Sequence, residues 1–195
     1  MKIREFQWIS PIQNIPSVLH HGILSYEAAA KLPHDSVAMQ EVQERRDKVQ
    51  VPGGLRLHQY ANLYFHARNP MLFKRKDEAA DLCVIRVSIE ARHIPGSVMA
   101  DRNASSDYVR FLSVAQIGQL DLEAIYARDW RHPGDPIAYY RHRSQKCAEF
   151  LVPHCVPPQY IVGAYATNDA AKAALQGTGF SSPIDIEPDL FFAQP

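Results

Sequence analysis

The chain has 195 residues, of which 46% are hydrophobic, enough for one domain with a substantial core. Its 21 basic and 21 acidic residues cancel, which excludes binding to nucleic acid or an anionic membrane through overall charge. Any basic surface must therefore be local. No apolar run approaches the ~18 residues of a membrane span, and the first residues lack the apolar core of a signal peptide. We expect a single domain over residues 1–195, in the cytoplasm and without a membrane partner.

The cysteines and histidines show no metal-site spacing. Three cysteines (Cys83, Cys147 and Cys155) contain no Cys-x-x-Cys pair, and nine histidines contain no His-x-x-x-His pair. The Pro-Gly-Gly at residues 52–54 matches neither the P-loop nor the dinucleotide fingerprint. We therefore expect reduced cysteines and no metal. A nucleotide, if bound, must be held by a motif other than these two.

The predicted elements in the first quarter of the chain are mainly helical. A strand over residues 6–9 precedes a helix over 15–19, for which Gly22 is the expected C-cap. Ser25 is the expected N-cap of a short helix over 25–32, and a longer helix follows over 35–49.

The rest of the chain is mainly predicted strand. Apolar and alternating runs predict strands over residues 61–66, 81–89, 97–101, 149–152 and 160–166, before a helix over 168–177. Short strands with helices gathered early and late indicate an α+β fold rather than a regular series of parallel βαβ units.

The helix over residues 35–49 contains an unusual arginine. Steps of three and four residues place Arg46 on one stripe with Met39, Val42 and Val49, so its guanidinium should face the interior. A buried guanidinium keeps its charge and needs an anion or several carbonyls. Two interpretations stay open: a structural salt bridge to a core carboxylate, or a site for a bound phosphate or carboxylate.

Glu149 is the one carboxylate in the apolar stretch "KCAEFLV", residues 146–152. Strand alternation places Ala148, Phe150 and Val152 on one face, and Glu149 with its neighbours two residues away on the other. The carboxylate lies either at a solvated strand end or inside a cleft.

Two further segments contain candidate functional side chains. Tyr64 and His66 share a strand face that could form a stacking surface, although most such aromatics belong to the core. Asp101 and Arg102 lie in a stretch of turn formers, for which an ordinary loop is the simpler interpretation.

The segment 106–145 is polar, aromatic and loop-prone, and is the expected place of functional elaboration. At its end, basic residues alternate with aromatic ones, and the candidates are Tyr140, Arg141, Arg143 and Lys146. Cations for phosphates and rings for bases suit single-stranded nucleic acid. A solvated loop would have the same composition.

Five motifs occur in a defined order along most of the chain: "ISPIQNIPSVLHHGIL", "QERRDKVQVPGG", "YFHARNPML", "MADRNAS" and "KCAEFLV". Together they resemble the DarT family of DNA ADP-ribosyltransferases, the toxins of DarTG toxin–antitoxin systems. The resemblance implies an ADP-ribosyltransferase-like fold, in which two packed small β-sheets with flanking helices hold NAD in a cleft between them.

The resemblance also assigns roles by position. Arg46 matches the catalytic arginine, and Glu149 matches the catalytic glutamate after the substrate-recognition loop. NAD, used as a substrate without a metal, would contact Trp8, Ser10, Asn14, Gly22 and Tyr64 in addition to Arg46. The N-terminal NAD-binding element, which includes Ser10 and Asn14, departs from the family pattern at one place. Gln7 and Trp8 stand where the family has a Tyr-His pair whose histidine contacts NAD.

The function implied is transfer of ADP-ribose from NAD to guanosine or thymidine in single-stranded DNA, as a toxin or anti-phage effector. An ADP-ribosyl hydrolase of macrodomain or NADAR type would be the antitoxin partner. Glu149 would stabilise positive charge on the ribose, and Arg46 would either clamp the diphosphate or orient the base. Two alternatives stay open: the same fold acting on RNA or protein, and a non-catalytic module that binds NAD or nucleic acid.

Overall fold

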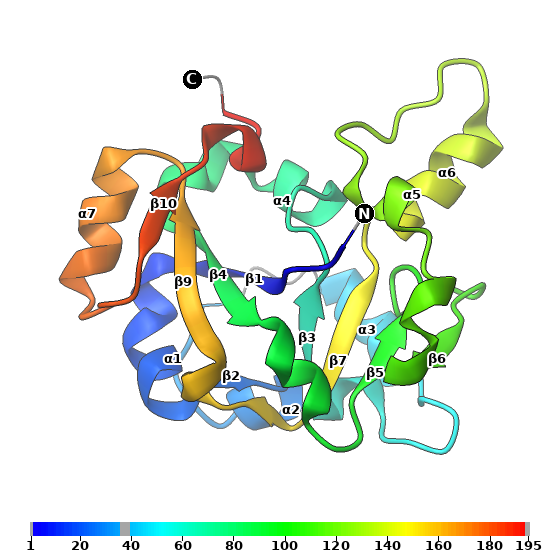
Figure 1. Cartoon of the computed structure of the whole chain (residues 1–195), viewed down its shortest axis with the longest axis horizontal. Helices are drawn as coiled ribbons and strands as arrows, with labels where there is room; N and C mark the ends of the chain where they lie inside the picture. Colours follow the sequence, from blue (N-terminus) through cyan, green and yellow to red (C-terminus); the bar gives the residue numbers. More distant parts are fainter. Residues whose placement is uncertain (1, 36–39, 194–195) are drawn as a thin grey trace.

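A computed structural model describes residues 2–35 and 40–193. In this part of the chain, eight strands form one sheet in the order β10-β9-β4-β1-β3-β7-β5-β6 (Figure 1). The strands are β1 (Glu5–Pro11), β3 (Tyr60–Tyr64), β4 (Leu82–Ser88), β5 (Val98–Ala100), β6 (Phe111–Ser113), β7 (Glu149–Pro153), β9 (Ile161–Ala166) and β10 (Ile184–Ile186). The short strands β2 (Ile23–Leu24) and β8 (Cys155–Val156) pair separately.

The sheet consists of two four-stranded halves. Strand β1 aligns with β4 over its whole length, but with β3 only at Gln7 and Tyr64. Strand β7 then continues the second half between β3 and β5. The predicted α+β class is confirmed, and the two small sheets of the prediction are halves of one hydrogen-bonded sheet joined at this single pair.

The helices lie around the two halves of the sheet. They are α1 (Ile15–His21), α2 (Tyr26–Ala29), α3 (Gln40–Asp47), α4 (Pro70–Lys74), α5 (Leu122–Tyr126), α6 (Pro136–Gln145) and α7 (Asp169–Gly177). Helix α7 packs on β9 and β10, whereas α5 and α6 lie beyond the other half (Figure 1). Helix α6 ends at Gln145, and only residues 146–148 separate it from β7.

Two element predictions need correction. The helix predicted over residues 35–49 is described from Gln40 to Asp47, Asp35 is not helical, and Met39 lies outside the described residues. The segment 106–145 is not mainly loop, because it contains β6, a 3-10 helix over Val114–Gln119, α5 and α6. The start of α6 has a recognisable signal, since Asp135 caps it through Ala138 N and Pro136 occupies its first turn.

The main core lies against one face of β7 and confirms the predicted alternation. Phe150 and Val152 are fully buried in this core, where Phe150 stacks on Phe6 with ring centroids 4.1 Å apart. Leu151 belongs to a separate cluster. The side chain of Glu149 therefore leaves the sheet away from the main core.

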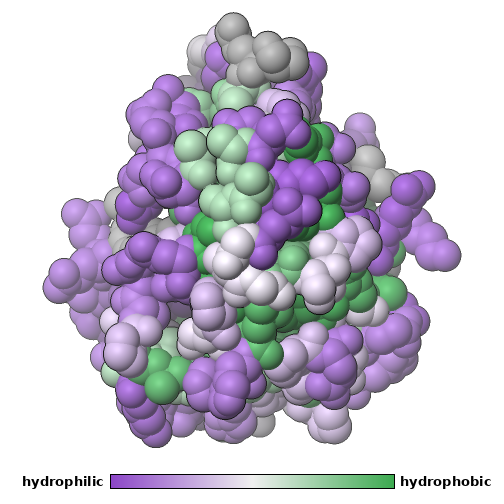
Figure 2. All heavy atoms as spheres, turned by 90° about the vertical axis from the view of Figure 1, so that its left-hand side faces the viewer, coloured by the Kyte–Doolittle hydropathy of each residue, from purple (hydrophilic) through white to green (hydrophobic). Residues whose placement is uncertain are grey.

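The side of the molecule that carries α7 and β10 shows hydrophobic atoms between hydrophilic ones (Figure 2). Val162 on β9 and Ile186 on β10 are among the exposed large apolar side chains of the described residues. Single exposed apolar residues are normal on protein surfaces and do not by themselves mark an interface. Among the described residues, no helix is long and apolar enough to span a membrane.

Candidate active site

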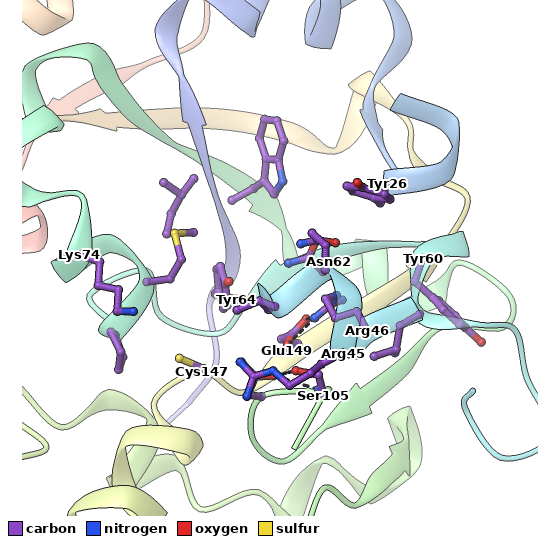
Figure 3. A pocket seen from close by; sticks show the side chains of 18 of the residues that line it. Tyr26, Arg45, Arg46, Tyr60, Asn62, Tyr64, Lys74, Ser105, Cys147 and Glu149 are labelled. Carbon is purple, nitrogen blue, oxygen red and sulfur yellow. Dashed lines mark hydrogen bonds and ion pairs between the residues drawn. The ribbon is translucent and has the colours of Figure 1, made fainter. Parts of the chain in front are cut away.

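A cleft of about 1310 Å³ lies where the two halves of the sheet meet. Its walls include side chains from β1, β3 and β7, from helices α1, α3 and α6, and from the loop after β5. Figure 3 shows Asn62, Tyr64, Arg46 and Glu149 grouped inside it. The elements that carry the predicted catalytic residues therefore converge on one cavity.

Arg46 and Glu149 form a buried ion pair in this cleft. Nη1 of Arg46 donates to both carboxylate oxygens of Glu149, at 3.0 Å to Oε1 and 2.9 Å to Oε2. The two side chains are only 7% and 1% exposed. The predicted inward direction of Arg46 is confirmed, and the interpretation of Glu149 as a solvated strand end is wrong.

The backbone around Glu149 explains how a carboxylate is held there. Glu149 pairs with Tyr64 on β3 and with Ala100 on β5, so both neighbouring strands shield the carboxylate. The chain turns after β5, and the N–H of Ala104 donates to Oε1 at 2.9 Å. From the residues that the structure describes, Oε1 thus accepts two hydrogen bonds and Oε2 accepts one. Oε2 therefore has a lone pair that can accept a hydrogen bond from a ligand.

The loop that supplies Ala104 is fixed by a buried carboxylate. Asp101 accepts from Nε of Arg102 at 3.1 Å, and from Nε and N of Arg110 at 2.9 and 3.0 Å. Burial alone would raise the pKa of Asp101, but these hydrogen bonds outweigh it and hold the pKa below its ordinary value. The turn predicted at Asp101 and Arg102 is present, and it positions a backbone donor in the cleft.

Tyr64 lines the cleft next to Glu149, whereas His66 does not. Burial, followed by the negative charge of Glu149, raises the pKa of Tyr64, so its hydroxyl stays protonated. His66 lines a separate cavity of about 350 Å³. The hypothesis of a stacking surface shared by Tyr64 and His66 is therefore wrong, because β3 ends at Tyr64 and the chain then turns.

The residues of the N-terminal element also line the cleft. Trp8 and Ser10 lie on β1, Asn14 precedes α1 and Gly22 follows it. Asn14 exchanges two hydrogen bonds with the backbone of Asp35, at 2.6 and 3.1 Å. Their roles toward NAD stay predictions, but the fold brings all of them to one cavity.

Gly22 is required by its backbone and its surroundings. Its φ of +81° lies in the left-handed region, and an added Cβ would overlap the Val156 carbonyl oxygen and approach Cys155 Sγ to 2.8 Å. We expect Gly22→Ala to lower the free energy of unfolding by about 1–3 kcal/mol in urea denaturation. Gly118→Ala is the matched control, because its Cβ would meet nothing within 4 Å. Equal effects of the two substitutions would contradict this prediction.

Three of the four predicted DNA-binding residues border the cleft, and the fourth does not. Tyr140, Arg141 and Arg143 on α6 line it. Lys146 is fully buried, and its Nζ donates to Ile125 O at 2.9 Å and Ala127 O at 2.7 Å. Composition alone could not predict that the side chain of Lys146 points inward, because its direction is set by where helix α6 ends. The structure corrects the prediction for Lys146, which is a buried tie and no phosphate contact.

The third partner of Lys146 is His66 Nδ1, at 3.1 Å. Burial, followed by the charge of Lys146, lowers the pKa of His66 to about 3, so the neutral ring accepts this hydrogen bond. One ammonium group thus ties the end of α5, the end of α6 and the residues after β3 together.

We expect Lys146→Met to lower the free energy of unfolding by about 2–5 kcal/mol, because buried carbonyls lose their donor. Burial lowers the pKa of Lys146 from 10.5 to about 8. Between these values the unfolded chain binds more protons, so Lys146 makes the native protein relatively more stable as pH rises. The stability difference between native protein and variant should therefore grow from about pH 8 to 10.5. A constant difference in denaturation across this range would contradict the assignment.

Sequence reasoning missed several groups in the cleft. Asn62 lies two residues before Tyr64 on β3 and lines the cleft with it, as strand alternation would have indicated. The Ala104 N–H has no sequence signal, because a backbone donor is placed by the loop and not by a side chain. Tyr108 was also missed, because its loop reads as an ordinary turn.

The chain is similar to proteins of one family. The family model "ssDNA thymidine ADP-ribosyltransferase, DarT" matches residues 8–192. A DNA ADP-ribosyl transferase of Thermus sp. (strain 2.9) is 32% identical over 162 residues, which is 76% of this chain and 74% of that protein. A DNA ADP-ribosyl transferase–DNA ADP-ribosyl glycohydrolase fusion protein of Thermosipho africanus is 28% identical over 206 residues. That match covers all of this chain but only 50% of the fusion protein.

Solved structures agree with this likeness. Thermosipho africanus DarTG in complex with ADP-ribose superposes with a TM-score of 0.85 at 26% identity, over 97% of this chain and 51% of that one. Thermus sp. 2.9 DarT in complex with ADP-ribosylated ssDNA gives 0.81 at 27% identity, over 96% of both chains. The fold and the cleft are those of an ADP-ribosyltransferase domain. Because the family model spans nearly all of the sequence, the chain belongs to the DarT family.

Proposed function

We propose that this protein transfers ADP-ribose from NAD to a base of single-stranded DNA. The observation that carries the proposal is the buried Arg46–Glu149 pair, held in the cleft of a DarT-family fold. In the same family, the Thermus sp. 2.9 protein has been solved with NAD+ and with ADP-ribosylated ssDNA. Those structures support the choice of donor and acceptor.

Glu149 is proposed to act on the ribose of NAD. The bond from the ribose C1′ to the nicotinamide nitrogen breaks, its electron pair leaves with nicotinamide, and positive charge develops on the ribose. A carboxylate in a cleft poor in water stabilises that charge strongly. Oε2 accepts only one hydrogen bond from the described protein groups, so it can also hold the ribose 2′-hydroxyl.

The acceptor base then attacks the ribose. A ring or exocyclic nitrogen of the base forms the new bond to C1′, and its proton passes to Glu149 and on to water. Arg46 holds the carboxylate in its orientation until NAD binds. We propose that it then either clamps the NAD diphosphate or orients the base. The acceptor is guanosine or thymidine, and the description of the family model supports thymidine.

The N-terminal element is proposed to bind NAD. Ser10, Asn14, Gly22 and Tyr64 border the cleft in which the cofactor would lie. Trp8 replaces the histidine of the family pattern and is partly buried beside the core. An indole offers a large stacking surface but one donor only, so Trp8 would contact a ring of NAD rather than its phosphates.

A hydrolase partner is proposed from the fused relative. The Thermosipho africanus protein joins a DNA ADP-ribosyl transferase to a DNA ADP-ribosyl glycohydrolase, and this chain spans about half its length. A separate hydrolase of macrodomain or NADAR type would remove the mark made here. We propose that the enzyme acts as a toxin or anti-phage effector in the cytoplasm, where NAD and exposed single-stranded DNA are both available.

The test is a transfer assay with labelled NAD and three acceptors: single-stranded DNA, RNA and protein. We expect label on the DNA, and mass spectrometry of its nucleosides should identify the modified base. Label on RNA or protein alone would support the second enzymatic function in place of this one. Folded protein that labels no acceptor and releases no nicotinamide would support a binding module.

A further inference from the structure

Along one rim of the cleft, beyond Arg46 and Glu149, large apolar side chains are unusually exposed to solvent. Tyr108, Ile137 and Tyr140 are 80%, 72% and 63% exposed, the three highest values among the large hydrophobic side chains that the structure describes. All three border the same cleft. They come from two segments, the loop after β5 and the first half of α6. Large exposed apolar side chains gathered at one cavity indicate a binding surface.

The segment that presents Tyr108 is held in place rather than loose. Asn103 N donates to Ser144 O at 3.0 Å, which joins the loop to α6. Val109 N donates to Ser106 O at 3.1 Å, which closes the turn around Tyr108. The same loop gives Glu149 its backbone donor from Ala104. A ligand on Tyr108 would therefore sit at a fixed position relative to the catalytic carboxylate.

The charges on this rim favour an anionic partner. Arg141 and Arg143 line the cleft on α6 and form no ion pair with any residue in ranges 2–35 and 40–193. Asp101 pairs with both Arg102 and Arg110 on the loop after β5, so its single negative charge offsets one of their two positive charges. Two uncompensated cations beside exposed rings match the repeating phosphate and base of a single strand.

We propose that Tyr108 and Tyr140 are the residues on which the bases next to the acceptor stack. The proposal rests on the proposed function and adds to it a footprint wider than one nucleotide. Stacking on a ring tolerates any base, so the two tyrosines set a minimum strand length rather than a sequence. Arg141 and Arg143 hold the phosphates between these bases. A protein partner on the same rim is the other occupant that the experiment separates.

Binding of fluorescein-labelled oligothymidylates of three and twelve nucleotides, measured without NAD, tests this independently of catalysis. We expect the native protein to prefer the longer strand. Tyr108→Ala and Tyr140→Ala should each weaken binding of the twelve-mer by roughly 5- to 100-fold and reduce the length preference, whereas Tyr108→Phe keeps both. Val162→Ala is the control, because Val162 is an exposed apolar residue on β9 that does not line the cleft.

The outcomes separate the two proposals. Three results would overturn the stacking assignment: unchanged binding by Tyr108→Ala, an equal loss of binding with Val162→Ala, or no binding by native protein. If a protein occupies the rim instead of DNA, we expect unchanged binding by Tyr108→Ala or no binding by native protein. Weaker binding by the tyrosine variants, with no transfer of label by native protein, would support the stacking assignment and overturn the proposed function. Transfer to DNA with equal KM for strands of both lengths would overturn only the stacking assignment.

Discussion

Replacement of Glu149 by glutamine is expected to lower the rate of ADP-ribose transfer by roughly 10²–10³-fold or more, the size of effect seen when a preorganised electrostatic group is lost. The amide keeps the shape of the carboxylate, and its oxygen can still accept from Arg46 and Ala104. It carries no charge to stabilise the ribose and cannot take the base proton. The measurement is the initial rate of label transfer from NAD to single-stranded DNA.

Glutamine is chosen over alanine because of the burial of the pair. Glu149→Ala would leave the guanidinium of Arg46 buried and unpaired, so lost activity could reflect lost folding. Glu44→Gln is the matched control, since Glu44 is exposed on the same helix as Arg46 and does not line the cleft. A folded Glu149→Gln protein that transfers ADP-ribose at the native rate would contradict the assignment.

Local patterns in the sequence predicted the direction of the two proposed catalytic side chains. A three- and four-residue stripe aimed Arg46 inward, and strand alternation separated Glu149 from Phe150. Neither pattern could show that the two side chains meet, because they are 103 residues apart in the chain. Burial of Glu149 depends on β3 and β5 as its neighbours, which is a property of the sheet order.

Composition was a weaker guide than periodicity. The basic and aromatic stretch at residues 130–146 indicated DNA contacts, yet one of its cations, Lys146, points inward at the end of α6. The helix itself was missed although its Asp-Pro start is a recognised signal. The backbone donor from Ala104 could not be predicted at all, because it depends on how Asp101 folds the loop.

Replacement of Arg46 by methionine is expected to be costly in two ways. The carboxylate of Glu149 would remain 1% exposed without its cation, and breaking a buried pair in this way costs about 3–5 kcal/mol of the free energy of unfolding. Transfer to DNA should fall as strongly as in Glu149→Gln, because the same carboxylate loses its orientation. Lys48→Met is the matched control, since Lys48 is exposed just after the same helix and does not line the cleft. Denaturation curves and initial rates measure the two effects.

The double variant Arg46→Met/Glu149→Gln distinguishes an ion pair from two independent residues. With the charge on Glu149 removed, the methionine no longer faces a buried unpaired anion, so most of the lost stability should return. Activity should not return, because the reaction needs the carboxylate itself. The losses in rate should also be far from additive, since the two groups act as a unit. Additive losses in both stability and rate would mean that the 2.9 Å contact between Arg46 and Glu149 contributes to neither.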